Sequence, residues 1–207
     1  MTRGARLGPP PLPPANLPRR TLAISSVGAG TILYRIHRSH QAPLYFGRES
    51  DPDRRQRWDA PDASYGVCYM AQESHIAFAE TLLRDLELDA VLEAELAIRV
   101  LARLHVRTPL RLAAMHGKAL RRLGADASVV QGSYDVTWAW SAAFHAHPDT
   151  PDGICYRARH DDSGFSIALF ERARDKVEHL DSVELLAPAH ARELARWLDR
   201  YDVGVTS

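Results

Sequence analysis

Hydrophobic and polar positions recur with different periods along the chain, and these periods predict short strands and helices. The strongest signal lies at residues 66–71, where the apolar run 67–69 suits a buried strand. Turn-forming residues precede this run, and Ser74 follows it as a residue type that caps helices. The pattern therefore predicts a turn, a strand, a cap and then a helix that ends at about Arg84.

The same reasoning predicts the elements of the remaining chain. Strands are expected at 31–37, 110–115, 153–159, 165–171 and 183–186, with a short strand or turn at 43–47, and helices at 89–103, 117–123, 134–147 and 187–201. The polar run 160–164 suits a hairpin between the strands that flank it. Strands and helices interleave, but their connections are too uneven for a doubly wound sheet. We therefore predict an α+β fold.

Composition bounds the domain organisation. The chain has 207 residues, enough for one domain with a sizeable core. Residues 1–20 are rich in proline and arginine, which favours an extended segment without packing. We predict a disordered tail at 1–20 and a single domain at 21–207. Lys+Arg and Asp+Glu both number 26, and this zero net charge argues against general binding of nucleic acid or an anionic membrane.

The sequence shows no pattern typical of a disulfide framework, a membrane span, a signal peptide or a metal site, and this sets the expected location and metal content. Cys68 and Cys155 lie in apolar runs and are expected to be buried free thiols. No uncharged stretch approaches the roughly 18 residues that span a bilayer, and the N-terminus has no apolar signal-peptide core. The expected location is the cytoplasm. The ten histidines show no metal-binding spacing, so no metal is expected.

Glu80 is the unusual residue of the helix predicted after Ser74. On a helical wheel it lies at the edge of the apolar stripe, roughly 40° from Ile76. One interpretation is a boundary glutamate paired with Arg84, its i+4 neighbour. The other is a carboxylate held beside a cleft, with Tyr69 as its neighbour. The spacing is compatible with both.

Arginines form the second unusual pattern. Arg35 lies between apolar residues in the middle of the predicted strand 31–37, where an arginine needs an anion as partner. The segment 48–57 carries four arginines and leads directly into the strand 66–71; it is either a solvated face or part of a site. The sequence contains no phosphate loop and no nucleophile elbow.

Seven segments of the chain carry a further pattern: Leu33–Arg38, Pro43–Gly47, Arg57–Pro61, Tyr65–Ala71, Ala79–Thr81, Asp152–Arg157 and Ala168–Phe170. Taken in order, these segments resemble the RES-domain family, the toxins of bacterial toxin–antitoxin pairs named for an arginine, a glutamate and a serine. The resemblance implies a fold related to ADP-ribosyltransferases, with small packed β-sheets surrounded by helices. It implies cleavage of the nicotinamide–ribose bond of NAD, with water or phosphate as acceptor, and no separate cofactor.

The resemblance assigns roles residue by residue. Arg35 matches the arginine of the family name and Glu80 matches the glutamate. Arg57 matches a second arginine of the pocket, and Tyr69 matches the tyrosine eleven residues before the glutamate. Tyr34 adjoins Arg35 and is expected to line the same pocket.

The match fails at the serine. The family pattern Tyr-Arg-Ser-Arg-His reads Tyr156 to His160 here, with Ala158 at the serine position, and neither Ser163 nor Ser166 fits the register. The alanine is either a natural divergence or a change that makes a toxic enzyme tolerable to its host.

Three functions therefore stay open. They are an NAD-degrading toxin weakened by Ala158, an inactive protein that uses an NAD pocket to bind a partner, and an ADP-ribosyltransferase. The resemblance also implies a helix-turn-helix antitoxin as partner and leaves room for a homodimer within such a complex.

Overall fold

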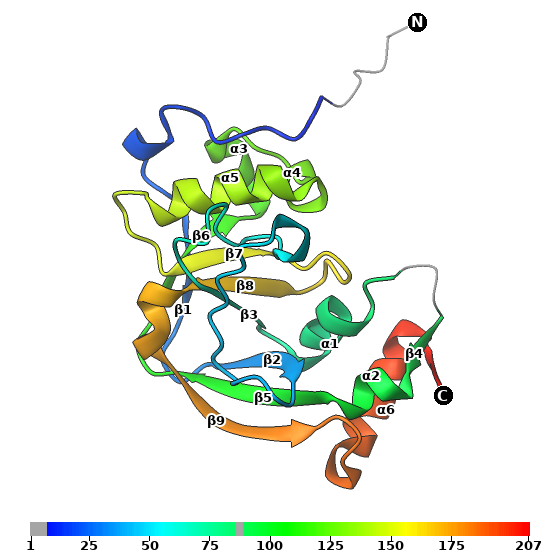
Figure 1. Cartoon of the computed structure of the whole chain (residues 1–207). Coiled ribbons are helices and arrows are strands. Elements are labelled where there is room, and N and C mark those ends of the chain that lie inside the picture. The colour runs from blue at the N-terminus through cyan, green and yellow to red at the C-terminus, as the bar shows by residue number, and fades with distance from the viewer. Residues whose placement is uncertain (1–7, 86–88) are drawn as a thin grey trace, which may run out of the picture.

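The computed structural model describes residues 8–85 and 89–207 (Figure 1). Eight of the described strands form one sheet in the order β1-β6-β7-β8-β3-β2-β5-β9, and β10 pairs with β4 in a second. The strands are β1 (Ile24–Val27), β2 (Ile32–Arg38), β3 (Val67–Ala71), β4 (Ala90–Leu92), β5 (Arg99–Val106), β6 (Leu110–Met115), β7 (Gly153–Arg157), β8 (Phe165–Phe170), β9 (Val177–Glu184) and β10 (Gly204–Thr206).

Helices flank the curled sheet, so the predicted α+β class is confirmed. The α-helices are α1 (Ser74–Leu82), α2 (Glu93–Ala97), α3 (Gly117–Leu123), α4 (Ser128–Gln131), α5 (Tyr134–His145) and α6 (Ala191–Tyr201). Short 3-10 helices are η1 (Leu17–Arg19), η2 (Pro52–Arg54), η3 (Glu171–Lys176) and η4 (Pro188–His190). Among the described residues, no helix is long and apolar enough to cross a membrane.

The sheet is divided between β2 and β3. These neighbours pair only at Tyr34 and Ala71 over their described lengths, whereas β2 pairs with β5 from Ile32 to Arg38. Each strand is therefore held mainly by its outer neighbour, and the two halves of the sheet diverge. In Figure 1, α1 lies at the side where β3 and β2 separate, and it packs on both.

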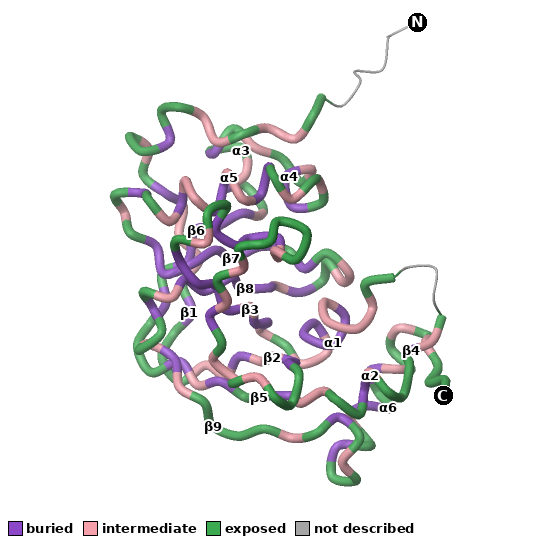
Figure 2. Tube along the Cα trace, viewed as in Figure 1, coloured by how far each residue is buried: buried purple, intermediate pink, exposed green. Residues whose placement is uncertain are grey.

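Apolar packing fixes the two halves. Trp140 and Phe144 of α5 are fully buried against the half that contains β7 and β8. On the other half, Phe78 of α1 packs on Trp197 of α6 with ring centroids 5.2 Å apart. Figure 2 shows that β9, at the sheet edge, is exposed over most of its length. A further buried cluster, with Leu33 of β2 and Cys68 of β3, spans the division and joins the two halves.

Several predictions are confirmed. The strand 110–115 and the helix 117–123 have the predicted bounds, and Gly124 ends that helix with φ of 78°. The strands β7 and β8 pair antiparallel as the predicted hairpin. Cys68 and Cys155 are buried free thiols.

The predicted helix at 89–103 is wrong. This segment forms β4, the short α2 and the start of β5. Apolar residues at 91, 92, 96, 100 and 101 fit a helical period, but Ala102, Leu104 and Val106 alternate on one buried face of β5. Pairing with β2 and β9 on both sides satisfies the main chain of this strand, so tertiary context outweighs the local period.

The predicted cap is also wrong. Glu73 is the residue before α1, and Ser74 is its first helical residue. The Ser74 hydroxyl donates to Glu193 Oε1 at 2.8 Å instead of capping the helix. Glu193 lies on α6, so Ser74 contributes a link between two helices that spacing along one helix cannot reveal.

The N-terminal segment differs from its prediction as well. Residues 1–7 lie outside the described residues, but residues 8–20 pack on the domain. Leu17 is 1% exposed, and Trp140 Nε1 donates to the Pro11 carbonyl at 2.8 Å. The buried His147 ring contacts the Leu17 carbonyl at 3.0 Å. The prolines exclude a regular α-helix here, but the short helix η1, which contains Pro18, still buries Leu17.

Candidate functional site

Five of the six predicted site residues line one cleft, which opens where β2 and β3 separate. The cleft has a volume of about 740 Å³. We call it the Glu80 cleft; its defining residues are Tyr34, Arg35, Arg57, Tyr69 and Glu80. Because they come from β2, β3, α1 and the loop before β3, the fold brings together positions far apart in the sequence.

Glu80 is held by main-chain donors. Its Oε1 accepts the N–H groups of Arg159 at 2.6 Å and His160 at 2.8 Å, from the loop after β7. Arg84 donates instead to the main-chain carbonyl of Glu80, so the structure does not support the predicted side-chain pair between these residues. Two charge-assisted hydrogen bonds fix the carboxylate, and its charge is left in the cleft.

Arg35 lies on the cleft side of β2. Its Nη1 donates to the Tyr69 carbonyl at 2.9 Å and approaches Cys68 Sγ at 3.6 Å. The anion expected from the sequence is thus replaced in part by a carbonyl of β3. This hydrogen bond joins the two strands where their main chains have separated.

The hydroxyl group of Tyr69 makes hydrogen bonds within the protein. The hydroxyl donates to Asp59 Oδ1 at 2.8 Å and accepts the Trp58 N–H at 2.8 Å. Burial raises the pKa of both the Tyr69 phenol and the Asp59 carboxyl. The proton therefore stays on Tyr69, and what this residue offers a ligand is its ring. Sequence reasoning missed Asp59, although it lies in the matching segment 57–61.

Arg57 is 8% exposed and oriented by its neighbours. Its Nη1 donates to the Gly132 carbonyl at 3.0 Å, and its guanidinium lies 4.6 Å from the centroid of the Tyr134 ring. Burial lowers the pKa of Arg57, but a guanidinium stays charged in proteins. The cleft thus holds a fixed, buried positive charge.

Buried polar atoms without partners converge on this cleft. Among the described residues, those that line it are Arg35 Nε, His37 Nε2, Arg57 Nη2, Arg99 Nε and Ser166 Oγ. A buried polar atom normally has a hydrogen-bond partner, so such a group indicates a functional role or a missing ligand. Within the described part of the chain, eight arginines line the cleft against three carboxylates. The cleft therefore suits a polar, anionic ligand.

Ala158 is the predicted site residue that does not line the cleft. It is 2% exposed and packs in an apolar cluster with Ile76 and Ala77. It lines a neighbouring cavity of about 890 Å³, the Ala158 cavity, with His116 and Tyr201. Arg159 and His160, which hold Glu80, line both spaces.

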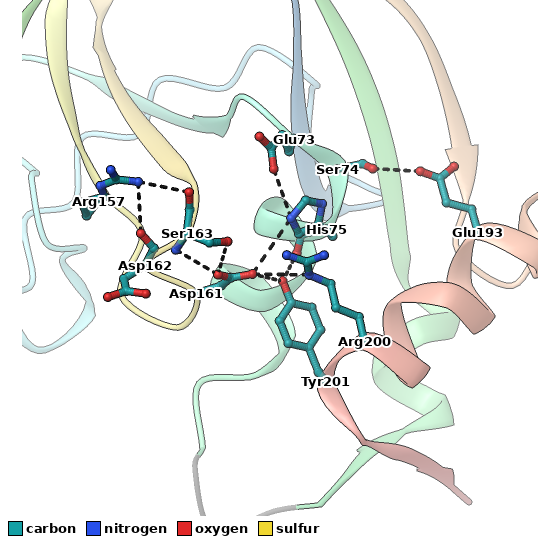
Figure 3. Close-up of polar contacts among 10 residues, drawn as sticks. All are labelled: Glu73, Ser74, His75, Arg157, Asp161, Asp162, Ser163, Glu193, Arg200 and Tyr201. Carbon is teal, nitrogen blue, oxygen red and sulfur yellow. Dashed lines mark hydrogen bonds and ion pairs between the residues drawn. The ribbon is translucent and has the colours of Figure 1, made fainter.

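The loop that carries these two amides is tied down by side chains (Figure 3). Asp161 Oδ2 accepts the Tyr201 hydroxyl at 2.8 Å, and its Oδ1 accepts the Ser163 N–H at 3.0 Å. Arg157 Nη1 donates to the carbonyls of Asp162 at 3.1 Å and Ser163 at 3.0 Å. The C-terminal turn of α6 and the loop itself thus set the position from which the amides reach Glu80.

Comparisons with known proteins identify the fold and the family of the chain. No curated protein sequence matches the chain significantly. The crystal structure of the MbcT–MbcA toxin–antitoxin complex of M. tuberculosis contains a chain of similar fold, with a TM-score of 0.64 and 20% sequence identity, over 83% of this chain and 92% of that one. The model of the RES domain matches residues 32–195. Because this match spans most of the sequence, the chain belongs to the RES-domain family.

Proposed function

We propose that the chain is a toxin that degrades NAD by cleaving its nicotinamide–ribose bond. The observation that carries this proposal is the Glu80 carboxylate, fixed by two main-chain N–H groups in a cleft rich in arginine. Membership of the RES-domain family and the fold shared with a chain of a toxin–antitoxin complex support it. We also propose that the protein acts in the cytoplasm, where its proposed substrate NAD is present.

The chemistry gives the carboxylate its role. The bond between the ribose C1′ and the nicotinamide nitrogen breaks, and the electron pair leaves with nicotinamide. Positive charge develops on the ribose, as in glycoside hydrolysis. A preoriented carboxylate stabilises this charge more in the transition state than in the ground state. The oxygen of water or phosphate then bonds to C1′, and water gives up a proton.

The arginines suit the other end of the substrate. Arg35 Nε and Arg57 Nη2 are buried donors without partners among the described residues. Guanidinium groups bind phosphate oxygens through paired N–H donors, so these two can hold the pyrophosphate of NAD. The Tyr69 ring, with its hydroxyl occupied, offers a face for the nicotinamide or its ribose.

Ala158 favours a second candidate function. A chain that lacks the family hydroxyl can retain an NAD pocket and act by binding a partner. An ADP-ribosyltransferase would use the same charge stabilisation but transfer the ADP-ribose group to a macromolecule. Release of free nicotinamide by the purified chain, without labelling of added protein or nucleic acid, supports degradation over both alternatives. NAD binding without release supports the partner-binding protein.

Arg35→Ala and Arg57→Ala are each expected to weaken NAD binding by about 1.5–3 kcal/mol, or roughly ten- to a hundredfold, because each removes charged hydrogen-bond donors. Calorimetric titration with NAD, corrected for nicotinamide release, measures this. Arg121→Ala, an exposed position on α3 away from the cleft, is the matched control and should bind as the parent does. Parent-like binding by both cleft variants would refute the phosphate-holding role.

We further propose an antitoxin of helix-turn-helix type as partner. The chain of similar fold was crystallised in a toxin–antitoxin complex, and the excess of arginine in the Glu80 cleft suits an acidic segment that covers it. Co-expression with the neighbouring reading frame is expected to yield a co-purifying complex and to relieve growth arrest. A neighbour that neither binds nor restores growth argues against the toxin–antitoxin setting and leaves the chemistry untouched.

A further inference from the structure

Ser166 is a buried hydroxyl of the Glu80 cleft for which the sequence predicted no role. It lies on β8, opposite Ala71 of β3 and Tyr156 of β7. It is 3% exposed, and its Oγ has no hydrogen-bond partner among the residues that the structure describes. Its side chain nevertheless lines the cleft. Desolvation of this hydroxyl is therefore not offset by a hydrogen bond of standard geometry within the described chain.

The surroundings do not explain a serine here by packing. Two residues further along the same face of β8, Ala168 is fully buried. An alanine at 166 would remove the unpaired hydroxyl at no cost in volume. A buried polar group without a partner is explained when it binds something that enters the cleft.

Ser166 and Glu80 line the same cleft. Tyr156 also lines it and is paired with Ser166 across β7 and β8. Burial raises the pKa of the Tyr156 phenol, and the charge of Glu80 raises it further. The contact between Ser166 and Tyr156 does not have the geometry of a hydrogen bond, so the hydroxyl can turn to a ligand.

Position 158 does not provide such a group. The Ala158 methyl packs against apolar side chains and lines the neighbouring cavity. We propose that Ser166 supplies the hydroxyl that hydrogen-bonds the reacting ribose, in place of the hydroxyl that is absent at position 158. This proposal rests on the proposed function, because it takes the ligand of the Glu80 cleft to be NAD.

The test compares two ligands that differ by the reacting sugar. ADP-ribose carries the ribose from which nicotinamide leaves, and ADP has the same pyrophosphate and adenosine without it. Ser166→Ala is expected to weaken ADP-ribose binding about three- to tenfold and to leave ADP binding unchanged, since one neutral hydrogen bond is lost. Ser26→Ala, at an exposed position of β1, is the matched control and should bind both ligands as the parent does.

Each outcome decides the matter. Equal ADP-ribose binding by parent and Ser166→Ala overturns the inference. An equal loss for both ligands, together with a lower melting temperature, shows that Ser166 acts through folding and also overturns it. If the parent binds neither ligand and releases no nicotinamide, the proposed function fails first. If the parent cleaves NAD and only the Ser166 result is negative, the proposed function stands without this inference.

Discussion

Glu80→Gln is expected to abolish NAD cleavage while the fold stays intact. Glutamine keeps the size of the side chain, and its carbonyl oxygen can still accept the N–H groups of Arg159 and His160. The negative charge that we propose to stabilise the developing positive charge on the ribose is lost. Loss of one preorganised electrostatic group lowers kcat by about 10²–10³-fold. The measurement is nicotinamide release over time, with circular dichroism to check folding.

The matched control for this substitution is Glu93→Gln. Glu93 is exposed in the first turn of α2 and does not line the cleft, so its replacement removes the same charge without touching the site. The control should keep the parent rate. A Glu80→Gln protein that is folded and releases nicotinamide at the parent rate would show that the carboxylate has no catalytic role.

Gly153→Ala is expected to destabilise the domain by roughly 3 kcal/mol, because an added methyl group cannot fit. A Cβ atom at this position would lie 2.3 Å from the Ala168 carbonyl oxygen and 2.9 Å from Leu169 Cα. Both are main-chain atoms of β8, which is fixed between β7 and β3 and cannot move without loss of sheet pairing. Urea unfolding followed by tryptophan fluorescence measures the change.

Gly28→Ala is the control for a glycine substitution in this fold. A Cβ atom there would meet no heavy atom within 4 Å. Gly28 directly follows β1, a strand at the edge of the sheet. Its unfolding midpoint is expected to stay near that of the parent. If Gly153→Ala unfolds at the parent midpoint as well, the close approach between β7 and β8 described here is incorrect.

The elements that the sequence predicted well are those whose local signals agree. The hairpin of β7 and β8 combines two apolar runs with a polar turn, and α3 ends at a glycine in the left-handed region. The spacing of apolar residues in the segment 89–103 is compatible with a helix and also with a buried strand. Its pairing with β2 and β9 decides the outcome, and pairing partners are not visible in a local pattern.

The same limit applies to the candidate site, because local patterns do not reveal contacts made by the folded chain. The residue pattern singled out Arg35 and Glu80, and the family resemblance assigned roles to them and to Tyr34, Arg57 and Tyr69. All five line one cleft. Asp59 is oriented by the hydroxyl of Tyr69, and Ser166 faces the cleft only because β8 pairs with β3 and β7, so spacing gave no signal for either. The packing of residues 8–20 was missed because composition describes the tendency of a segment in isolation and not the surface it meets.

The way in which Glu80 is anchored leaves room for evolutionary change. Both donors to its Oε1 belong to the main chain of residues 159 and 160, so the side chains at these positions can vary while the carboxylate stays in place. Only proline, which lacks an N–H group, is excluded. Arg159 and His160 line the cleft and the neighbouring cavity at once. Selection for a new protein partner can therefore alter the surface around the site without displacing the carboxylate to which we assign the chemistry.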